Sequence, residues 1–180
     1  FRVVAVDPPV LGKRFNVEGP SGPLGIEIEA FVVPGKIPLY LEDEEAGVDL
    51  GTKEGDTLGL KVIETSTGKH FFYVPGCAKL DEDLRTRLKG AALVFFDGTL
   101  YTNDEMIKQG LLDKTGDRMG HMNMSGSSGT IAAFADLGVK RKVFIHINNS
   151  NPALRDDGPE RKAVEAAGWE VSYDGMALKV

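Results

Sequence analysis

Two short apolar segments constrain the fold of this chain more than any other feature of its sequence. They span residues 91–96 and 142–147, and neither shows the apolar-polar alternation of a half-exposed strand over its central residues. Short runs of this kind are typical of strands buried on both faces of a sheet. Between them, Thr102 to Glu105 has capping-box spacing for a helix ending at Gly110, and 130–137 predicts a small-residue helix capped by Ser127 or Ser128. Buried strands alternating with helices indicate an α/β (α+β) fold.

The flanking regions extend this pattern. Residues 26–30 alternate apolar and acidic side chains as a half-exposed strand does, and 57–64 with 70–74 have hairpin composition. Three further elements are expected: a helix between Asp81 and Gly90, a helix from Pro159 to Gly168, and a strand over 169–173. The first third is therefore expected to be β-rich, which fits half of a layered sandwich.

The N-terminal region carries the breaker residues. The apolar run 1–6 looks like a strand already in progress, so we expect the sequence to begin inside a larger protein. Residues 7–24 are dense in glycine and proline and predict a loop. Residues 42–56, rich in Asp, Glu and Gly, predict a solvated loop or a hairpin excursion.

Composition narrows the classes of function. The formal net charge is −6, from 27 acidic and 21 basic residues, which disfavours a general nucleic-acid binder. No apolar run approaches the roughly 20 residues of a membrane-spanning helix, and no secretory leader is seen. Cys77 is the single cysteine, so an intrachain disulfide and a thiolate-rich zinc site are excluded, and a cytoplasmic setting fits best.

Two polar residues end the buried strands. Asp97 follows the first apolar run, and His146 stands near the end of the second. Because ligands gather at the carboxyl ends of strands in α/β sheets, both side chains are expected to face one site. The alternative is that Asp97 only caps the turn that follows and His146 is a hydrogen-bonded core histidine.

Other candidates are weaker when taken singly. His121, in the Gly- and Met-rich segment 119–126, is a ligand, a general acid or base, or a loop residue. The amide-rich segment 148–151 either satisfies local backbone groups or contacts a polar ligand. Cys77 also follows a strand, where a lone cysteine is more often a small buried hydrophobe than a ligand.

Several blocks of the sequence together resemble a known family. They are Tyr73-Val74-Pro75-Gly76-Cys77-Ala78, Phe95-Phe96-Asp97-Gly98-Thr99-Leu100, Gly120-His121-Met122, the segment 146–152 and the segment 165–176. In this order they resemble the C-terminal blocks of the PqqB family of pyrroloquinoline quinone (PQQ) biosynthesis, a branch of the metallo-β-lactamase superfamily.

The resemblance implies an αββα sandwich with metals at one edge. Residues 1–180 would be the C-terminal part of one such domain, with a strand start and loop over 1–24 and a PqqB-like body over 25–180. The superfamily's His-x-His-x-Asp-His sequence, which supplies most ligands, does not occur here. The fold is therefore expected to be incomplete, with the N-terminal half missing.

The resemblance also implies roles for individual residues. His146 matches the last histidine ligand of the superfamily. Asp97 and His121 match an acid/histidine pair near the metals, and Asp97 is also a candidate ligand. Cys77 stands where a bridging carboxylate is expected, which counts against a dinuclear hydrolase and favours a softer or single metal.

Three functions of the full-length protein follow from this resemblance. The first is an iron- or zinc-dependent hydroxylase or oxygenase acting on a tyrosine-derived PQQ precursor. The second is a carrier of PQQ or its precursor, with contacts from Arg118, Asn148 and Asn149, because PQQ is a planar polyanion. The third is a hydrolase of the same fold. This chain itself is expected to bind no metal tightly, to lack catalysis, and to self-associate through exposed apolar surface.

Overall fold

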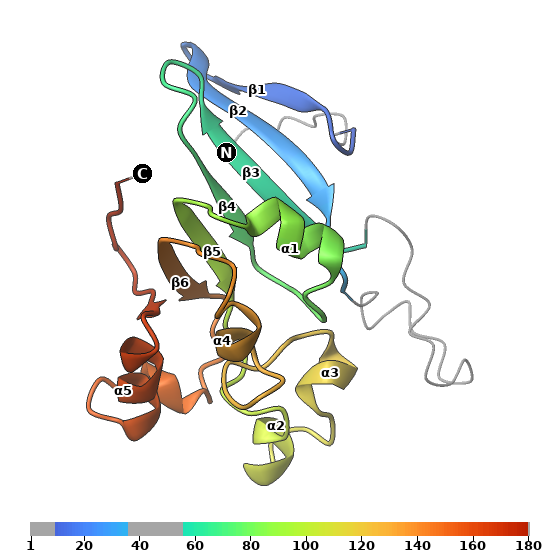
Figure 1. The fold of residues 1–180 in the computed structure, drawn as a ribbon, viewed down its shortest axis with the longest axis vertical. Helices are drawn as coiled ribbons and strands as arrows, with labels where there is room; N and C mark the ends of the chain where they lie inside the picture. The colour runs from blue at the N-terminus through green and yellow to red at the C-terminus, as the bar shows by residue number, and fades with distance from the viewer. Residues whose placement is uncertain (1–9, 36–55, 180) are drawn as a thin grey trace.

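The computed structural model describes residues 10–35 and 56–179, which form one seven-stranded sheet with helices against it (Figure 1). The strands lie in chain order across the sheet. Neighbours from β1 to β4 are antiparallel, whereas β4 to β7 are parallel. The strands are Arg14–Gly19 (β1), Gly22–Val32 (β2), Leu58–Glu64 (β3), His70–Val74 (β4), Leu93–Asp97 (β5), Arg141–Ile145 (β6) and Glu170–Val171 (β7).

Helices occupy the connections between the parallel strands, because a parallel pair needs a crossover. They are Glu82–Leu88 (α1), Glu105–Lys108 (α2), Gly116–Met119 (α3), Thr130–Ala133 (α4), the 3₁₀ turn Pro152–Leu154 (η2) and Pro159–Ala166 (α5). The predicted alternation of buried strands and helices is confirmed. None of the helices in the described part of the chain is long and apolar enough to cross a bilayer.

The main core lies on one face of the sheet, beneath α1 (Figure 1). Leu84 and Leu88, on one side of α1, are buried there with Phe72 of β4. The predicted N-cap is confirmed, since the Asp81 carboxylate accepts a hydrogen bond of 2.9 Å from the Leu84 amide. Trp169 stacks on another core residue, Phe144 of β6, at 4.0 Å between ring centroids.

The opposite face of the antiparallel strands is apolar but incompletely covered. By register, side chains that alternate with the core residues point away from α1, among them Phe15, Val32 and Tyr73. These three are 40%, 39% and 39% exposed. The second sheet of an αββα sandwich is not found among residues 10–35 and 56–179.

The loop predicted for residues 7–24 is wrong where the structure describes it. β1 and β2 form a hairpin in which Gly19 pairs with Gly22 around Pro20-Ser21. Gly22 has φ +115°, a backbone conformation that residues other than glycine rarely adopt. The glycines and prolines therefore mark a tight turn instead of a long loop. Residues 1–9, and all of the predicted excursion 42–56 except Asp56, lie outside the described residues.

Two predicted helices are shorter than expected. Only Thr130–Ala133 is α-helical in the segment 130–137, and its N-cap is Gly129 with no side-chain cap, so the capping prediction for Ser127 or Ser128 is wrong. The segment after Thr102 becomes helical only at Glu105. The Glu105 carboxylate accepts a hydrogen bond from the Tyr101 amide instead of completing a capping box.

Candidate metal centre

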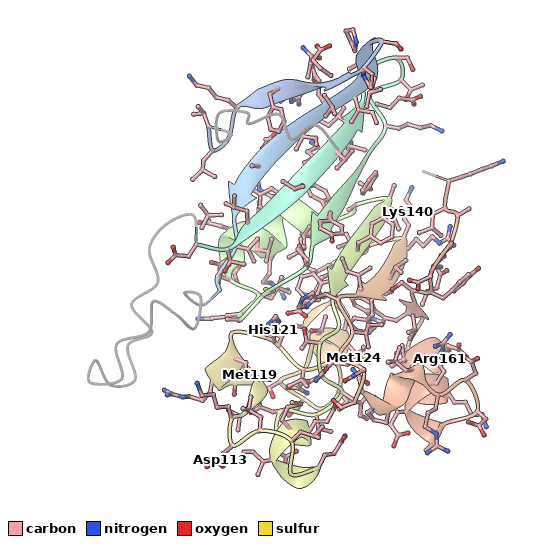
Figure 2. The ribbon with its side chains drawn as sticks, turned by 180° about the vertical axis from the view of Figure 1, so that it is seen from behind. Asp113, Met119, His121, Met124, Lys140 and Arg161 are labelled. Carbon is pink, nitrogen blue, oxygen red and sulfur yellow. The ribbon has the colours of Figure 1, made fainter. Side chains whose placement is uncertain are left out.

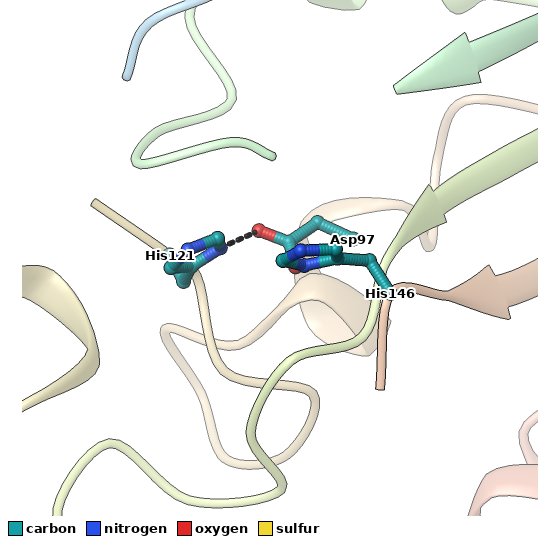
Figure 3. Close-up of side chains that lie close together, drawn as sticks. All are labelled: Asp97, His121 and His146. Carbon is teal, nitrogen blue, oxygen red and sulfur yellow. Dashed lines mark hydrogen bonds and ion pairs between the residues drawn. The ribbon is translucent and has the colours of Figure 1, made fainter. Parts of the chain in front are cut away.

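Three side chains from separate segments meet at the carboxyl edge of the parallel strands (Figure 3). Asp97 ends β5 and pairs in register with Ile145, the last residue of β6, so His146 emerges beside it. The His146 Nδ1 atom lies 4.0 Å from Asp97 Oδ1, and the His121 Nδ1 atom lies 2.7 Å from Asp97 Oδ2. One candidate ligand atom from each residue lies within 4.8 Å of the other two. The convergence predicted from the two strand ends is therefore confirmed.

His121 reaches the site from the loop that follows α3 (Figure 2). Gly120 adopts a left-handed conformation (φ +83°) and ends α3, which turns the chain back toward the sheet. Met122, the residue after His121, donates its amide to the Cys77 carbonyl at 2.6 Å. This bond ties the loop to the segment after β4, so the His121 ring is held over Asp97.

His146 has the one positive φ, 52°, among the non-glycine residues of the described segments. This conformation is uncommon for a residue with a side chain and carries a cost of order 1 kcal/mol. The turn is held by the Gly98 amide, which donates to the Ile145 carbonyl, and by the Asn148 amide, which donates to the Thr99 carbonyl. The strained backbone presents a ring that is 56% exposed.

Asp97 is fully buried, and its carboxylate is saturated with hydrogen bonds. Oδ1 accepts from the Thr99 amide at 3.1 Å and the Thr99 hydroxyl at 2.6 Å. Oδ2 accepts from the Cys77 amide at 2.9 Å and lies 2.7 Å from His121 Nδ1. A carboxylate offers roughly four lone-pair sites, and all are engaged here. Asp97 in this arrangement orients its neighbours, and a metal bound by its carboxylate would have to replace one of these donors.

Thr99 is the residue at this site that sequence reasoning missed. Its hydroxyl lies 2.9 Å from His146 Nδ1 and 3.1 Å from His121 Nδ1, in addition to its bond to Asp97. The Asp-Gly-Thr spacing, which allows a carboxylate to bond the backbone two residues on, was the signal available for it. That signal predicts the turn but not the contacts with the two histidines.

Cys77 contributes its backbone, and its thiol lies outside the three-residue group. Sγ donates to the Lys79 carbonyl at 3.3 Å, and the side chain is fully buried. Burial, followed by the negative charge of Asp97, raises the pKa of the Cys77 thiol strongly. Since the thiolate is the form that binds metals, this geometry gives no support to Cys77 as a ligand.

The three residues expected to contact PQQ come from two elements, α3 and the loop after β6. Arg118 is exposed on α3, and Asn149 is exposed in the loop after β6. Asn148 is half-buried, and its side-chain amide donates to the Met106 sulfur at 3.2 Å. The predicted contacts with PQQ thus remain a hypothesis.

Asn151 holds the turn after β5, which carries Thr99. Its buried amide group donates to the Gly98 carbonyl at 3.0 Å and to the Thr99 carbonyl at 3.4 Å. Its side-chain oxygen accepts from the Ala153 amide at 2.9 Å. The side chain is thus directed at the turn after β5, so it supports that turn and does not face a ligand.

The strand-edge site and the mixed sheet define the class of protein. Residues 2–147 match the model of the family described as "Beta-lactamase superfamily domain", and the chain belongs to this family. The metallo-β-lactamase-like fold class expected from the sequence is thereby confirmed.

Two proteins with high sequence identity to this chain have names that refer to PQQ synthesis. The chain is 53% identical over 174 residues to "Coenzyme PQQ synthesis protein B" of Gluconacetobacter diazotrophicus, covering 95% of this chain and 55% of that protein. It is 46% identical over 175 residues to the protein of the same name from Xanthomonas oryzae pv. oryzae, covering 97% and 58%. The resemblance stated from the sequence is confirmed. The chain spans about half the length of these relatives.

Solved structures agree with this assignment. Zn(2+)-bound PqqB from Methylobacterium extorquens has a TM-score of 0.84 and 43% identity, covering 96% of this chain and 55% of that one. A diphosphatase of the PhnP family has a TM-score of 0.57 at 13% identity, covering 95% of this chain and 47% of that one. The second likeness shows the shared fold alone.

Proposed function

We propose that this chain is part of a protein that acts in PQQ biosynthesis. The observation that carries the proposal is the 53% identity to a coenzyme PQQ synthesis protein B over 95% of the chain. The three-residue group at the sheet edge adds a chemical reason, because imidazole and carboxylate groups in one place suit metal-dependent or proton-transfer chemistry.

The residues present fit a metal that is held by His146. Its ring is 56% exposed, and its Nδ1 atom is engaged by Thr99, which leaves Nε2 as the donor that faces outward. Imidazole nitrogen suits both zinc and iron, and the related M. extorquens protein is described as Zn(2+)-bound. A bound iron ion would supply open coordination positions at which oxygen is activated. The Asp97 and His121 side chains lie close enough to His146 to be further candidate ligands.

Asp97 and His121 are proposed to act as a proton-transfer pair beside the metal. Asp97 is buried and saturated, so it holds the His121 ring and balances a positive charge on it. The His121 side chain is 21% exposed, and it is therefore the member of the pair that exchanges a proton with a substrate. This division of roles resembles that of a carboxylate that orients a catalytic histidine.

The proposed reaction of the full-length protein is hydroxylation of a tyrosine-derived PQQ precursor with molecular oxygen. It is tested by incubating the iron-loaded full-length protein and the precursor with ¹⁸O-labelled oxygen and analysing the product by mass spectrometry. The expected result is incorporation of label that His121→Ala abolishes. If the product forms without label from oxygen, the hydroxylase proposal is wrong.

A carrier of PQQ is the alternative, and titration of PQQ separates it from catalysis. Tight binding without turnover, weakened by Arg118→Ala or Asn149→Ala, would favour the carrier. The hydrolase alternative is disfavoured by Cys77, which places a buried thiol with a raised pKa where a bridging carboxylate is expected.

Metal binding by this chain is tested by calorimetric titration with Zn²⁺ and with Fe²⁺ under anaerobic conditions. Because His146 is the more exposed of the two histidines in the group, we expect weak binding that His146→Ala reduces by about tenfold or more. His70→Ala is the matched control, since His70 lies at the start of β4 and is not a member of the group. Equal binding by the wild type and His146→Ala would contradict the assignment of His146.

A further inference from the structure

We propose that Thr99 is a positioning residue that determines which ring nitrogen His146 and His121 present to a ligand. The proposal rests on the metal site proposed above, but it concerns the tautomers of the two histidines, which are a property of the metal-free chain. One hydroxyl group lies within hydrogen-bonding distance of a carboxylate and of two imidazole rings.

The Thr99 hydroxyl has a single hydrogen, and its shortest contact is the 2.6 Å bond to Asp97 Oδ1. The hydroxyl also lies 3.1 Å from a second acceptor, the His146 carbonyl oxygen. The ionised carboxylate is the nearer and stronger acceptor, so the hydroxyl hydrogen is used in the bond to Asp97. The 2.9 Å contact between the Thr99 oxygen and His146 Nδ1 is then favourable only if that nitrogen carries the hydrogen and donates it. His146 is therefore held as the Nδ1–H tautomer, with its Nε2 lone pair free.

His121 is held in the same tautomer. Its Nδ1 atom lies 2.7 Å from Asp97 Oδ2 and 3.1 Å from the Thr99 oxygen, and both of these atoms are acceptors once Thr99 donates to Asp97. His121 therefore also carries its hydrogen on Nδ1. The two rings lie nearly parallel, with an interplanar angle of 20° and centroids 5.4 Å apart. With both Nδ1 atoms protonated, the lone pair of each neutral ring is on Nε2.

The position of the Thr99 hydroxyl is itself fixed from several sides. Thr99 is 8% exposed, and its carbonyl accepts from the Asn148 amide and from the Asn151 side chain. These bonds join the turn after β5 to the turn after β6. The hydroxyl cannot turn away from the rings without breaking its bond to Asp97.

Long-range ¹H–¹⁵N correlation spectra of the histidine side chains test the proposal directly. At about pH 8, where an ordinary histidine with a pKa near 6.5 is neutral, the spectra show which ring nitrogen is protonated. In the metal-free wild-type chain we expect His146 and His121 as Nδ1–H tautomers. A free neutral histidine favours the opposite tautomer, so a wild-type His146 protonated on Nε2 would overturn the proposal without any variant being needed.

Variants of Thr99 supply the causal test. Thr99→Val removes the hydroxyl at nearly constant shape, and we expect the His146 signals to shift toward the Nε2–H tautomer. Thr99→Ser retains the hydroxyl and should restore the wild-type spectrum. Thr130→Val is the matched control, because Thr130 is fully buried and its hydroxyl has no hydrogen-bond partner among the described residues. An unchanged His146 tautomer in folded Thr99→Val would also overturn the proposal.

Metal affinity provides a second readout. In Thr99→Val we expect Zn²⁺ affinity to fall by about 10- to 100-fold, as for other residues that orient a ligating histidine, with recovery in Thr99→Ser. If the wild-type chain binds no metal but shows the Nδ1–H tautomers, the metal assignment fails and the role of Thr99 stands. If it binds metal with His146 protonated on Nε2, the role of Thr99 fails and the metal assignment stands.

Discussion

The Asp97 carboxylate lies fully buried beneath the exposed ring of His146, and donors from three separate segments converge on it. The Thr99 and Cys77 amides, the Thr99 hydroxyl and the His121 ring together occupy both oxygens. A buried polar group is costly only when its partners are missing, so this carboxylate both stabilises the three segments and depends on them.

Replacing the carboxylate should therefore destabilise the chain. In Asp97→Asn one oxygen is replaced by an amide NH2 group that cannot accept, which leaves at least one buried donor unpaired and lowers the free energy of unfolding by about 1–3 kcal/mol. Urea denaturation measures the loss. Asp136→Asn is the control, because Asp136 pairs with Arg85 on the surface with 72% of its side chain exposed, and it should change stability by less than about 1 kcal/mol. Equal effects of the two substitutions would contradict this account of Asp97.

The two parallel strands β5 and β6 position the site because their final residues are hydrogen-bonded neighbours. Asp97 pairs with Ile145, so the turns after both strands start at the same level of the sheet. The turn after β5 passes very close to β6 at Gly98. A Cβ atom at Gly98 would lie 2.8 Å from Met124 Cε, 2.9 Å from Phe144 Cβ and 3.2 Å from the Ile145 carbonyl oxygen.

Gly98→Ala should therefore push the two turns apart. We expect a loss of about 1–3 kcal/mol in the free energy of unfolding from overpacking, measured by urea denaturation. Gly76→Ala is the matched control, since a Cβ there meets only ordinary contacts at 3.7 Å and 3.8 Å, and its stability should be unchanged or slightly raised. A Gly98→Ala variant as stable as Gly76→Ala would show that the close approach of β5 and β6 is not required.

Among the described residues, the antiparallel strands have one face packed under α1 and the other face, here called the open face, only partly covered. Val32 and Tyr73 on the open face are each 39% exposed, and by register they lie on the same side of the sheet as Phe15. Exposed apolar surface on this scale favours association, and a second copy of the chain offers a matching apolar face.

We therefore expect the chain to self-associate through this face. Sedimentation or light scattering should show a concentration-dependent increase in mass, and the double substitution Val32→Lys with Tyr73→Lys should weaken association by about tenfold or more, since lysines resist burial. Ile107→Lys with Leu111→Lys is the control: these residues are 43% and 56% exposed near α2, away from the open face, and should not change the mass. A monomeric wild-type chain at about 100 µM would exclude this prediction.

The sequence by itself determined the alternation of buried strands and helices, because apolar periodicity and caps such as Asp81 act locally along the chain. It also placed Asp97 and His146 at one edge, since residues that end parallel strands share that edge. Hairpin pairing over 14–24 was missed, because glycine and proline mark tight turns and loops alike.

Only the tertiary structure decided what the site residues do. The Thr99 hydroxyl contacts residues 22 and 47 positions away, and the Asn151 amide reaches 52 positions back to the Thr99 carbonyl. No periodic pattern encodes contacts at such separations, because they depend on how the loops pack and not on the conformation of any one segment. For the same reason the sequence named Asp97 as a ligand candidate without showing the four donors that converge on its carboxylate beside the two histidines.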